Sequence, residues 1–240
     1  MELENDFVFS FFKCYFNFIR NNFKTHIMDK SKVFNVTSTI DLEKDAFFSL
    51  IDSDLKEQGT VVIKEEMINV YLKNGDERKF ENNFNKLKEF IKEKGYTFIP
   101  LDEESRWEEF NPNPLGKNVD DCSIRAYCAA ADIEWDTAFD YACEIGGTEK
   151  DIINSGKVCD RVITEKLGMV LNKESKKVKP KNRPTVMEFV CTHPEGTYIL
   201  MCNKHACTAK DGRYYDSFNS GKMKVKYYFS KPDESYTPEE

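Results

Sequence analysis

Three side chains from two distant segments could together make a sulfur nucleophile: Cys122, His205 and Asp216. Cys122 follows Asp120 and Asp121 at the start of a stretch whose apolar residues have helical spacing. Either aspartate can serve as the N-cap, because a short carboxylate accepts from the free N–H groups of a first helical turn. Cys122 would then lie within that turn, where the unpaired N–H groups and the helix dipole favour a thiolate.

The thiolate also needs a nearby cation, because the adjacent aspartates oppose it electrostatically. The chain has three histidines. His26 lies in an N-terminal extension, and His193 precedes Pro194 at an expected helix end, where it is placed to cap carbonyls. His205 opens an expected strand that lies beside a carboxylate, so it is the candidate partner of the thiol.

A hairpin brings that carboxylate to the histidine. Asp211-Gly212 predicts a two-residue type I′ turn. With those two residues as the turn, Cys207 pairs with Asp216, and His205 shares a face with Cys207 because side chains alternate along a strand. Asp216 is then the diagonal neighbour of His205 and within side-chain reach. It can hold one imidazole nitrogen while the other faces the thiol.

These segments carry a resemblance to a known family. Asp121-Cys122-x-x-Arg125-Ala126, followed by Gly196-Thr-Tyr-Ile-Leu, His205, Asp211-Gly212 and Tyr215-Asp216-Ser, resembles papain-like cysteine peptidases. The similarity is closest to a compact bacterial and phage group and covers residues 111–229. It implies an α+β fold in which N-terminal helices pack on an antiparallel sheet.

The resemblance also implies roles. Cys122 would be the nucleophile, His205 the general base and then acid, and Asp216 the residue that orients the ring, with no cofactor and no metal. The thiolate would attack a carbonyl of a protein or peptide substrate, and water activated by His205 would release the acyl group. An amine in place of water would make the same site a transferase.

The oxyanion donor departs from the family pattern. The family often has a glutamine six residues before the cysteine, and this chain has Gly116 there. Asn118 is the nearest amide and the expected donor, with Asn113 as an alternative, and the backbone N–H of Cys122 would add another. Arg125 is expected either to line the cleft or to tie the helix down.

Two other functions fit parts of the pattern. Cys202-x-x-His205-x-Cys207, with Cys191 or His193, has N/S spacing that could suit zinc. However, the chain has no Cys-x-x-Cys pair, and an extended strand would point Cys202 away from the other two. The second alternative is a non-catalytic binding module in which the Cys/His/Asp fold is a degenerate scaffold.

Composition limits the partners. The net charge of −7 and a sequence pI of about 5.3 argue against nucleic acid, and the lysine-rich stretch 173–183 has no interleaved aromatic residue, so a solvated loop is expected. The sequence contains no run of eighteen apolar residues, so no membrane span is predicted. The acidic start and the eight cysteines of a chain this long favour reduced thiols and a cytoplasmic location.

The chain divides into four parts. Residues 1–31 form an aromatic-rich extension, 32–101 an accessory α+β domain, 111–230 the thiol-bearing domain and 231–240 a flexible tail. The accessory domain, which could bind a partner protein together with the extension, would recruit substrate or occlude the cleft. Its expected order of strand, helix, two strands, helix and strand resembles a ferredoxin-like split unit; the elements are 33–38, 41–57, 60–64, 68–72, 80–94 and 96–101.

In the thiol-bearing domain, helices are expected first and a strand meander afterwards. The second helix should stop at Gly146-Gly147, and Thr185 with Glu188 predicts a capping box. The expected helices are 122–131, 137–145, 157–167 and 185–192, and the expected strands are 197–202, 205–210, 213–218 and 224–229.

Overall fold

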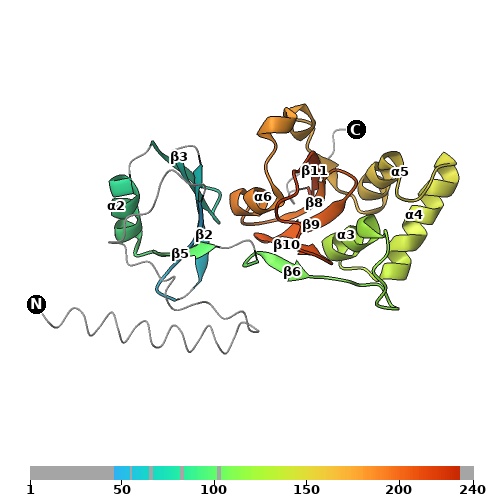
Figure 1. Ribbon diagram of the computed structural model, residues 1–240, viewed down its shortest axis with the longest axis horizontal. Coiled ribbons are helices and arrows are strands. Elements are labelled where there is room, and N and C mark those ends of the chain that lie inside the picture. Colours follow the sequence, from blue (N-terminus) through green and yellow to red (C-terminus); the bar gives the residue numbers. More distant parts are fainter. Residues whose placement is uncertain (1–45, 55, 65–66, 82–83, 102–103, 233–240) are drawn as a thin grey trace, which may run out of the picture.

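The computed structural model describes residues 46–54, 56–64, 67–81, 84–101 and 104–232. The described residues have a mixed α+β fold with one five-stranded and one six-stranded sheet (Figure 1), which confirms the predicted α+β class. The predicted extension 1–31, the predicted strand 33–38 and most of the predicted tail lie outside the described residues. No helix in the described ranges is long and apolar enough to cross a membrane.

The first sheet is antiparallel and has one helix on it. Its strands lie in the order β4-β3-β2-β1-β5. The helix α2 (Phe84–Lys94) buries Leu87 and Ile91 against apolar side chains of the sheet, among them Leu50 and Val61. The strands are β1 (Ala46–Ile51), β2 (Glu57–Lys64), β3 (Met67–Leu72), β4 (Glu77–Glu81) and β5 (Thr97–Leu101).

The predicted helix 41–57 is wrong over its described part, because residues 46–51 form β1. The strand packs apolar side chains on both of its faces: Phe48 packs in the cluster under α2, and Phe47 packs against the cluster around the helix α6 (Val186–Thr192). A strand that is covered on both faces has a nearly continuous apolar run, which a helical spacing can match by chance. The predicted helix 80–94 is likewise β4 at its start and α2 afterwards. The described elements therefore do not follow the split-unit order.

The second sheet carries the hairpin. Its strands lie in the order β6-β10-β9-β8-β11-β7. The strands β8, β9 and β10 form part of the predicted meander, but β11 pairs with β8 and not with β10. The edge strand β6, which pairs parallel to β10, lies between the predicted domains 32–101 and 111–230, where no strand was predicted. The strands are β6 (Trp107–Glu109), β7 (Val170–Leu171), β8 (Thr197–Met201), β9 (Ala206–Lys210), β10 (Arg213–Asp216) and β11 (Tyr227–Ser230).

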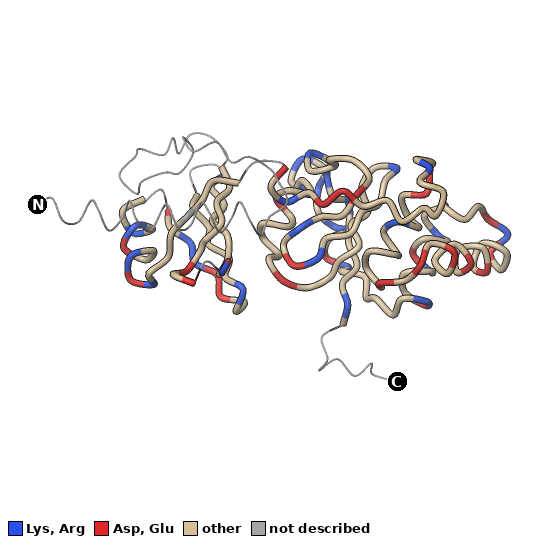
Figure 2. The backbone as a smooth tube through the Cα atoms, turned by 90° about the horizontal axis from the view of Figure 1, so that it is seen from below, with Lys and Arg blue, Asp and Glu red and all other residues tan. Residues whose placement is uncertain are grey.

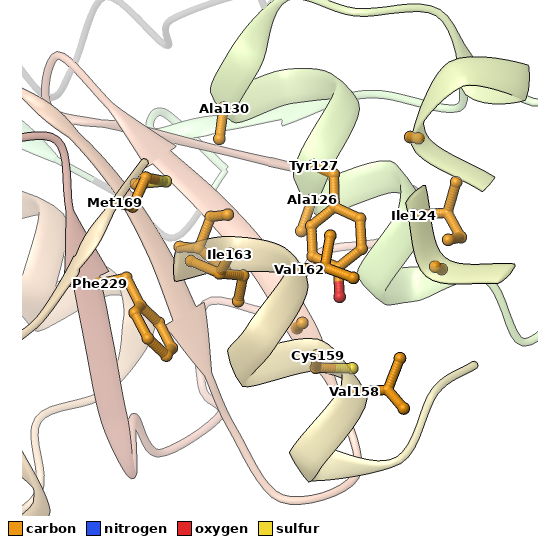
Figure 3. Packing of buried hydrophobic residues seen from close by; sticks show 14 of the residues in the cluster. Ile124, Ala126, Tyr127, Ala130, Val158, Cys159, Val162, Ile163, Met169 and Phe229 are labelled. Carbon is orange, nitrogen blue, oxygen red and sulfur yellow. The ribbon is translucent and has the colours of Figure 1, made fainter. Parts of the chain in front are cut away.

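Three helices cover one face of the second sheet. They are α3 (Cys122–Ala131), α4 (Trp135–Glu149) and α5 (Gly156–Arg161), the last continued by a π-helical turn (Val162–Lys166). Tyr127 from α3, Ile163 from the π-helical turn and Phe229 from β11 meet in the core beneath them (Figure 3). Acidic residues follow one another along α4 (Figure 2).

The helix α4 does not stop at Gly146-Gly147 as predicted. Gly146 is buried inside the helix, where a Cβ atom would lie 3.0 Å from the carbonyl oxygen of Asp151. The close approach of the chain that follows the helix thus accounts for this glycine. The helix ends at Glu149, and the C-cap residue Lys150 has a left-handed backbone (φ 57°) and an N–H that bonds to the Gly146 carbonyl.

The helix α6 (Val186–Thr192) lies between the two sheets (Figure 1). The predicted capping box is confirmed: Thr185 accepts from the Glu188 N–H, and the Glu188 carboxylate accepts from the Thr185 N–H. Glu188 also pairs with Lys64 of β2. Thr60 of β2 donates its hydroxyl to the Cys191 carbonyl. The described part of the first sheet is therefore attached to α6, on the side of the second sheet away from α3.

Candidate active site

The helix α3 begins at Cys122, as predicted, but Asp121 does not cap it. Asp121 occupies the N-cap position without a side-chain capping bond. Its carboxylate instead accepts from Arg125, from Trp135 Nε1 at 2.9 Å and from Asn113 Nδ2 at 3.4 Å. The Asp121 carboxylate is therefore bound by other donors, and the N–H groups of the first turn remain able to bind an anion at this helix end.

Buried contacts hold α3 on the second sheet and so fix the position of Cys122 relative to that sheet. Thr208 of β9 donates its hydroxyl to the Ala126 carbonyl at 2.7 Å, and both residues are buried. Tyr127 on the same helix is buried among side chains of α4, α5 and the sheet. These contacts place the start of α3 beside the start of β9.

The hairpin has the predicted turn and register. Asp211 and Gly212 both have positive φ (50° and 76°), as a type I′ turn requires. The strands then pair Lys210 with Arg213, Ala209 with Tyr214 and Thr208 with Tyr215. The register that was counted from the sequence is therefore confirmed for these three pairs.

Just before β9, a tight turn fixes the position of His205. The Cys202 N–H bonds to the His205 carbonyl at 2.8 Å, and Lys204 within the turn has a left-handed backbone (φ 56°). His205 therefore leaves the turn immediately before β9, at the end of the hairpin that adjoins Asp216.

His205 and Asp216 form a buried pair. The imidazole Nε2 lies 2.6 Å from Asp216 Oδ2, and the two side chains are only 9% and 2% exposed. The other carboxylate oxygen accepts from the Ser217 N–H at 2.8 Å. Burial alone would lower the pKa of His205, but the hydrogen bonds and charges of Asp216 and Cys122 raise it to about 9. The ring therefore stays protonated at neutral pH.

The remaining ring nitrogen, Nδ1, is left for the thiol. Burial acts to raise the pKa of Cys122, but three influences together bring it below its ordinary value: the hydrogen bond with His205, the backbone N–H of Ala206, and the positive charges of His205 and Arg125. The structure thus brings the three predicted residues together, with the imidazole between sulfur and carboxylate. Such an arrangement can hold a thiolate–imidazolium pair.

The predicted amide donors are placed differently. Asn118 is exposed in the loop before α3. The side-chain oxygen of Asn113 accepts from the Leu115 N–H at 3.0 Å, and its amide nitrogen bonds to Asp121, so it serves the loop itself. Because Cys122 is the first residue of α3, the donors nearest to the thiol are the backbone N–H groups of the first turn of that helix.

One contact of the site was not predicted from the sequence. The ring of Phe218 lies 4.9 Å from the His205 ring and is 46% exposed. Since Phe218 is two residues after Asp216, strand alternation could have placed it on the same side. Arg125, for which two roles were open, is buried and bonds to Asp121 and to the Val119 carbonyl, so it ties the helix start to the preceding loop.

The cysteines from Cys122 onward, which the structure describes, show no arrangement for zinc. Among the described residues, no group of three or more Cys, His, Asp or Glu side chains is arranged to hold a metal ion. Cys202 and Cys207 are buried free thiols, and His205 is committed to Asp216. Comparisons with models of known protein families, with curated proteins and with solved structures find no match to this chain.

Proposed function

We propose that this protein is a papain-like cysteine peptidase or amide hydrolase, with Cys122 as nucleophile, His205 as general acid and base, and Asp216 as the residue that orients the ring. The observation that carries the proposal is the position of His205. Its Nε2 is held by a buried carboxylate at 2.6 Å while the same ring hydrogen-bonds the thiol at the start of α3.

The proposed reaction has two steps. The Cys122 sulfur attacks the carbonyl carbon, and the carbonyl electrons move to oxygen; their return breaks the bond to nitrogen, and the departing amine takes the proton of His205. A water molecule then gives a proton to His205, its oxygen attacks the thioester carbon, and the sulfur leaves as thiolate. The first-turn N–H groups of α3 favour the negative oxygen in both steps.

The directions of the two pKa shifts also favour the reactive form of the site. The pKa of Cys122 lies below its ordinary value, and that of His205 is raised to about 9. Both shifts favour the thiolate–imidazolium pair, in which the thiolate attacks and the imidazolium protonates the leaving group. An amine that replaced water in the second step would make the protein an acyltransferase with the same three residues.

The contacts of the described part of the first sheet favour recruitment of substrate over occlusion of the cleft as its role. Its polar contacts run to α6 and to the segment that leads into β6, through Thr60, Lys64 and the Arg106–Glu57 ion pair. Cys122 belongs to α3, on the other face of the second sheet. A partner or a substrate held by the first sheet would therefore approach the thiol from the side.

The test compares alkylation and amide hydrolysis in matched variants. Wild-type protein, Cys122→Ala and His205→Gln are treated with iodoacetamide at neutral pH, and labelled cysteines are identified by peptide mapping. We expect Cys122 to react about tenfold faster than Cys143, the exposed free cysteine on α4, because more of it is thiolate. Cys122→Ala should lose hydrolysis of a peptide library.

Cys143→Ser is the matched control, because it also removes one free thiol, and it should retain wild-type hydrolysis. Equal alkylation rates for Cys122 and Cys143, unaffected by His205→Gln, would contradict the proposal. Rapid alkylation of Cys122 without hydrolysis or aminolysis of any peptide would favour the non-catalytic scaffold instead.

A further inference from the structure

The carboxylate next to the nucleophile is held by three donors from three places in the chain. Asp121 Oδ1 accepts from Arg125 one helical turn later, and Oδ2 accepts from Trp135 Nε1 at 2.9 Å and from Asn113 Nδ2 at 3.4 Å. Asp121 is 6% exposed and Arg125 is 5% exposed. An aspartate at an N-cap is normally bound to the helix it precedes, so this commitment to other donors is a particular feature of the site.

Without these donors, Asp121 would act against the proposed chemistry in two ways. The first intrahelical bond of α3 joins the Arg125 N–H to the Asp121 carbonyl at 3.0 Å, so the N–H groups before Arg125 have no partner within the helix. The Asp121 carboxylate would accept from these N–H groups and so occupy them. Its negative charge would also disfavour the thiolate of the next residue. Arg125 removes both effects, because it binds the carboxylate and places a positive charge near the sulfur.

We propose that Asp121 and Arg125 are a positioning pair that keeps the first turn of α3 open to the thiolate and to the negative oxygen of the acyl intermediate. This inference rests on the proposed function, since it assigns the pair to the same reaction. Arg125 also bonds to the Val119 carbonyl at 3.2 Å, so the pair fixes the loop that borders the nucleophile.

The other titratable groups around the sulfur come from several elements, and they are the same in every variant used below. The thiolate is therefore compared in a constant surrounding, and a difference between variants reports on the pair. The groups are His205 before β9, with Asp216 behind it, Cys202 at the end of β8, Tyr127 on α3, Cys159 on α5 and the exposed Asp120.

The test measures the pKa of the Cys122 thiol in the full chain, from the pH dependence of its alkylation by iodoacetamide. Asp121→Asn removes the negative charge and should lower the thiol pKa. Arg125→Gln leaves the carboxylate without its cation and should raise it. Each shift should be about one pH unit, the size expected for a nearby charge at a buried site. The double variant should return the thiol pKa close to that of the wild type.

Glu165→Gln and Arg161→Gln are the matched controls, because Arg161 and Glu165 form an ion pair with the same four-residue spacing. Neither should move the thiol pKa. A merely structural role would change the stability of the Asp121 and Arg125 variants without giving thiol shifts of opposite sign. Shifts of the same sign, or none, in folded variants would overturn the inference.

The test remains decisive if one variant fails to fold or if the protein has no detectable turnover. If Arg125→Gln does not fold, Asp121→Asn and the double variant still decide, because only an electrostatic pair predicts a lowered pKa in the first and a restored one in the second. The readout does not need turnover. Opposite thiol shifts in a protein that hydrolyses no substrate would support the electrostatic pair and reject the proposed function.

Discussion

The exchange Asp216→Asn tests how the carboxylate controls the imidazole. In the wild type, the rise of the His205 pKa from 6.5 to about 9 corresponds to about 3 kcal/mol in favour of the protonated ring. Asp216 supplies much of this through a buried contact at 2.6 Å, with Cys122 supplying the rest. Loss of the charge should lower the His205 pKa by about two units. At pH 8, the protonated fraction would then fall about tenfold.

The assay is the pH profile of kcat/KM on a peptide substrate, beside the pH profile of Cys122 alkylation. The basic limb of the activity profile should move from about pH 9 in the wild type to about pH 7 in the variant. The thiol should also titrate at higher pH, because the imidazolium that stabilises the thiolate is lost earlier. Unchanged profiles in a folded Asp216→Asn protein would refute the reasoning.

Three further predictions concern the same site. Thr208→Val removes the 2.7 Å bond to the Ala126 carbonyl and should cost about 1 kcal/mol of unfolding free energy in denaturant titrations; a null effect would show that the bond does not hold α3. Phe218→Ala should lower kcat/KM about 2- to 10-fold, because the ring contact with His205 is lost. The unfolding free energy should change by less than about 0.5 kcal/mol, because Phe218 is exposed. Phe218→Leu is the control, and a large loss of stability in Phe218→Ala would contradict this prediction. The folded pKa of His205 is raised, so its stabilising contribution is fully present below pH 6.5 and is lost as the pH rises through about 9; the stability difference between wild type and His205→Gln should shrink over that range, and a growing difference would be the wrong sign.

The hairpin was predictable because its signals are local. Two residues with positive φ define a type I′ turn, and the alternation of side chains then fixes which residues face one another. The helix that carries Cys122 was predictable for a similar reason, since a run of apolar residues follows a polar pair. These two local predictions were sufficient to bring three distant side chains together.

In the first sheet, the strands β2, β3 and β5 were predicted from the sequence, but β1 and β4 were not. Residues 46–51 are apolar on both faces because α2 covers one face and the cluster around α6 lies against the other. Only the tertiary structure decides between strand and helix for such a stretch. The short strand β6 has the same origin, because three residues gain their strand character by pairing with β10.

The prediction that the Asp121 side chain could cap α3 is wrong. Local propensity predicts that an aspartate before a helix caps it, but Trp135 and Asn113 compete for the same oxygens from outside the turn. The indole of Trp135 comes from the next helix, so nothing within the first turn could indicate the competition.

The position of α6 has a consequence for any attempt to produce the thiol-bearing half alone. Val62 of β2 belongs to the same apolar cluster as Val186 and Phe189 of α6, and Leu101 packs on that cluster. A chain that began at residue 104 would leave this side of α6 uncovered and Glu188 without its lysine from β2. Such a fragment should self-associate through the uncovered helix, so truncation is an unsuitable way to isolate the chemistry.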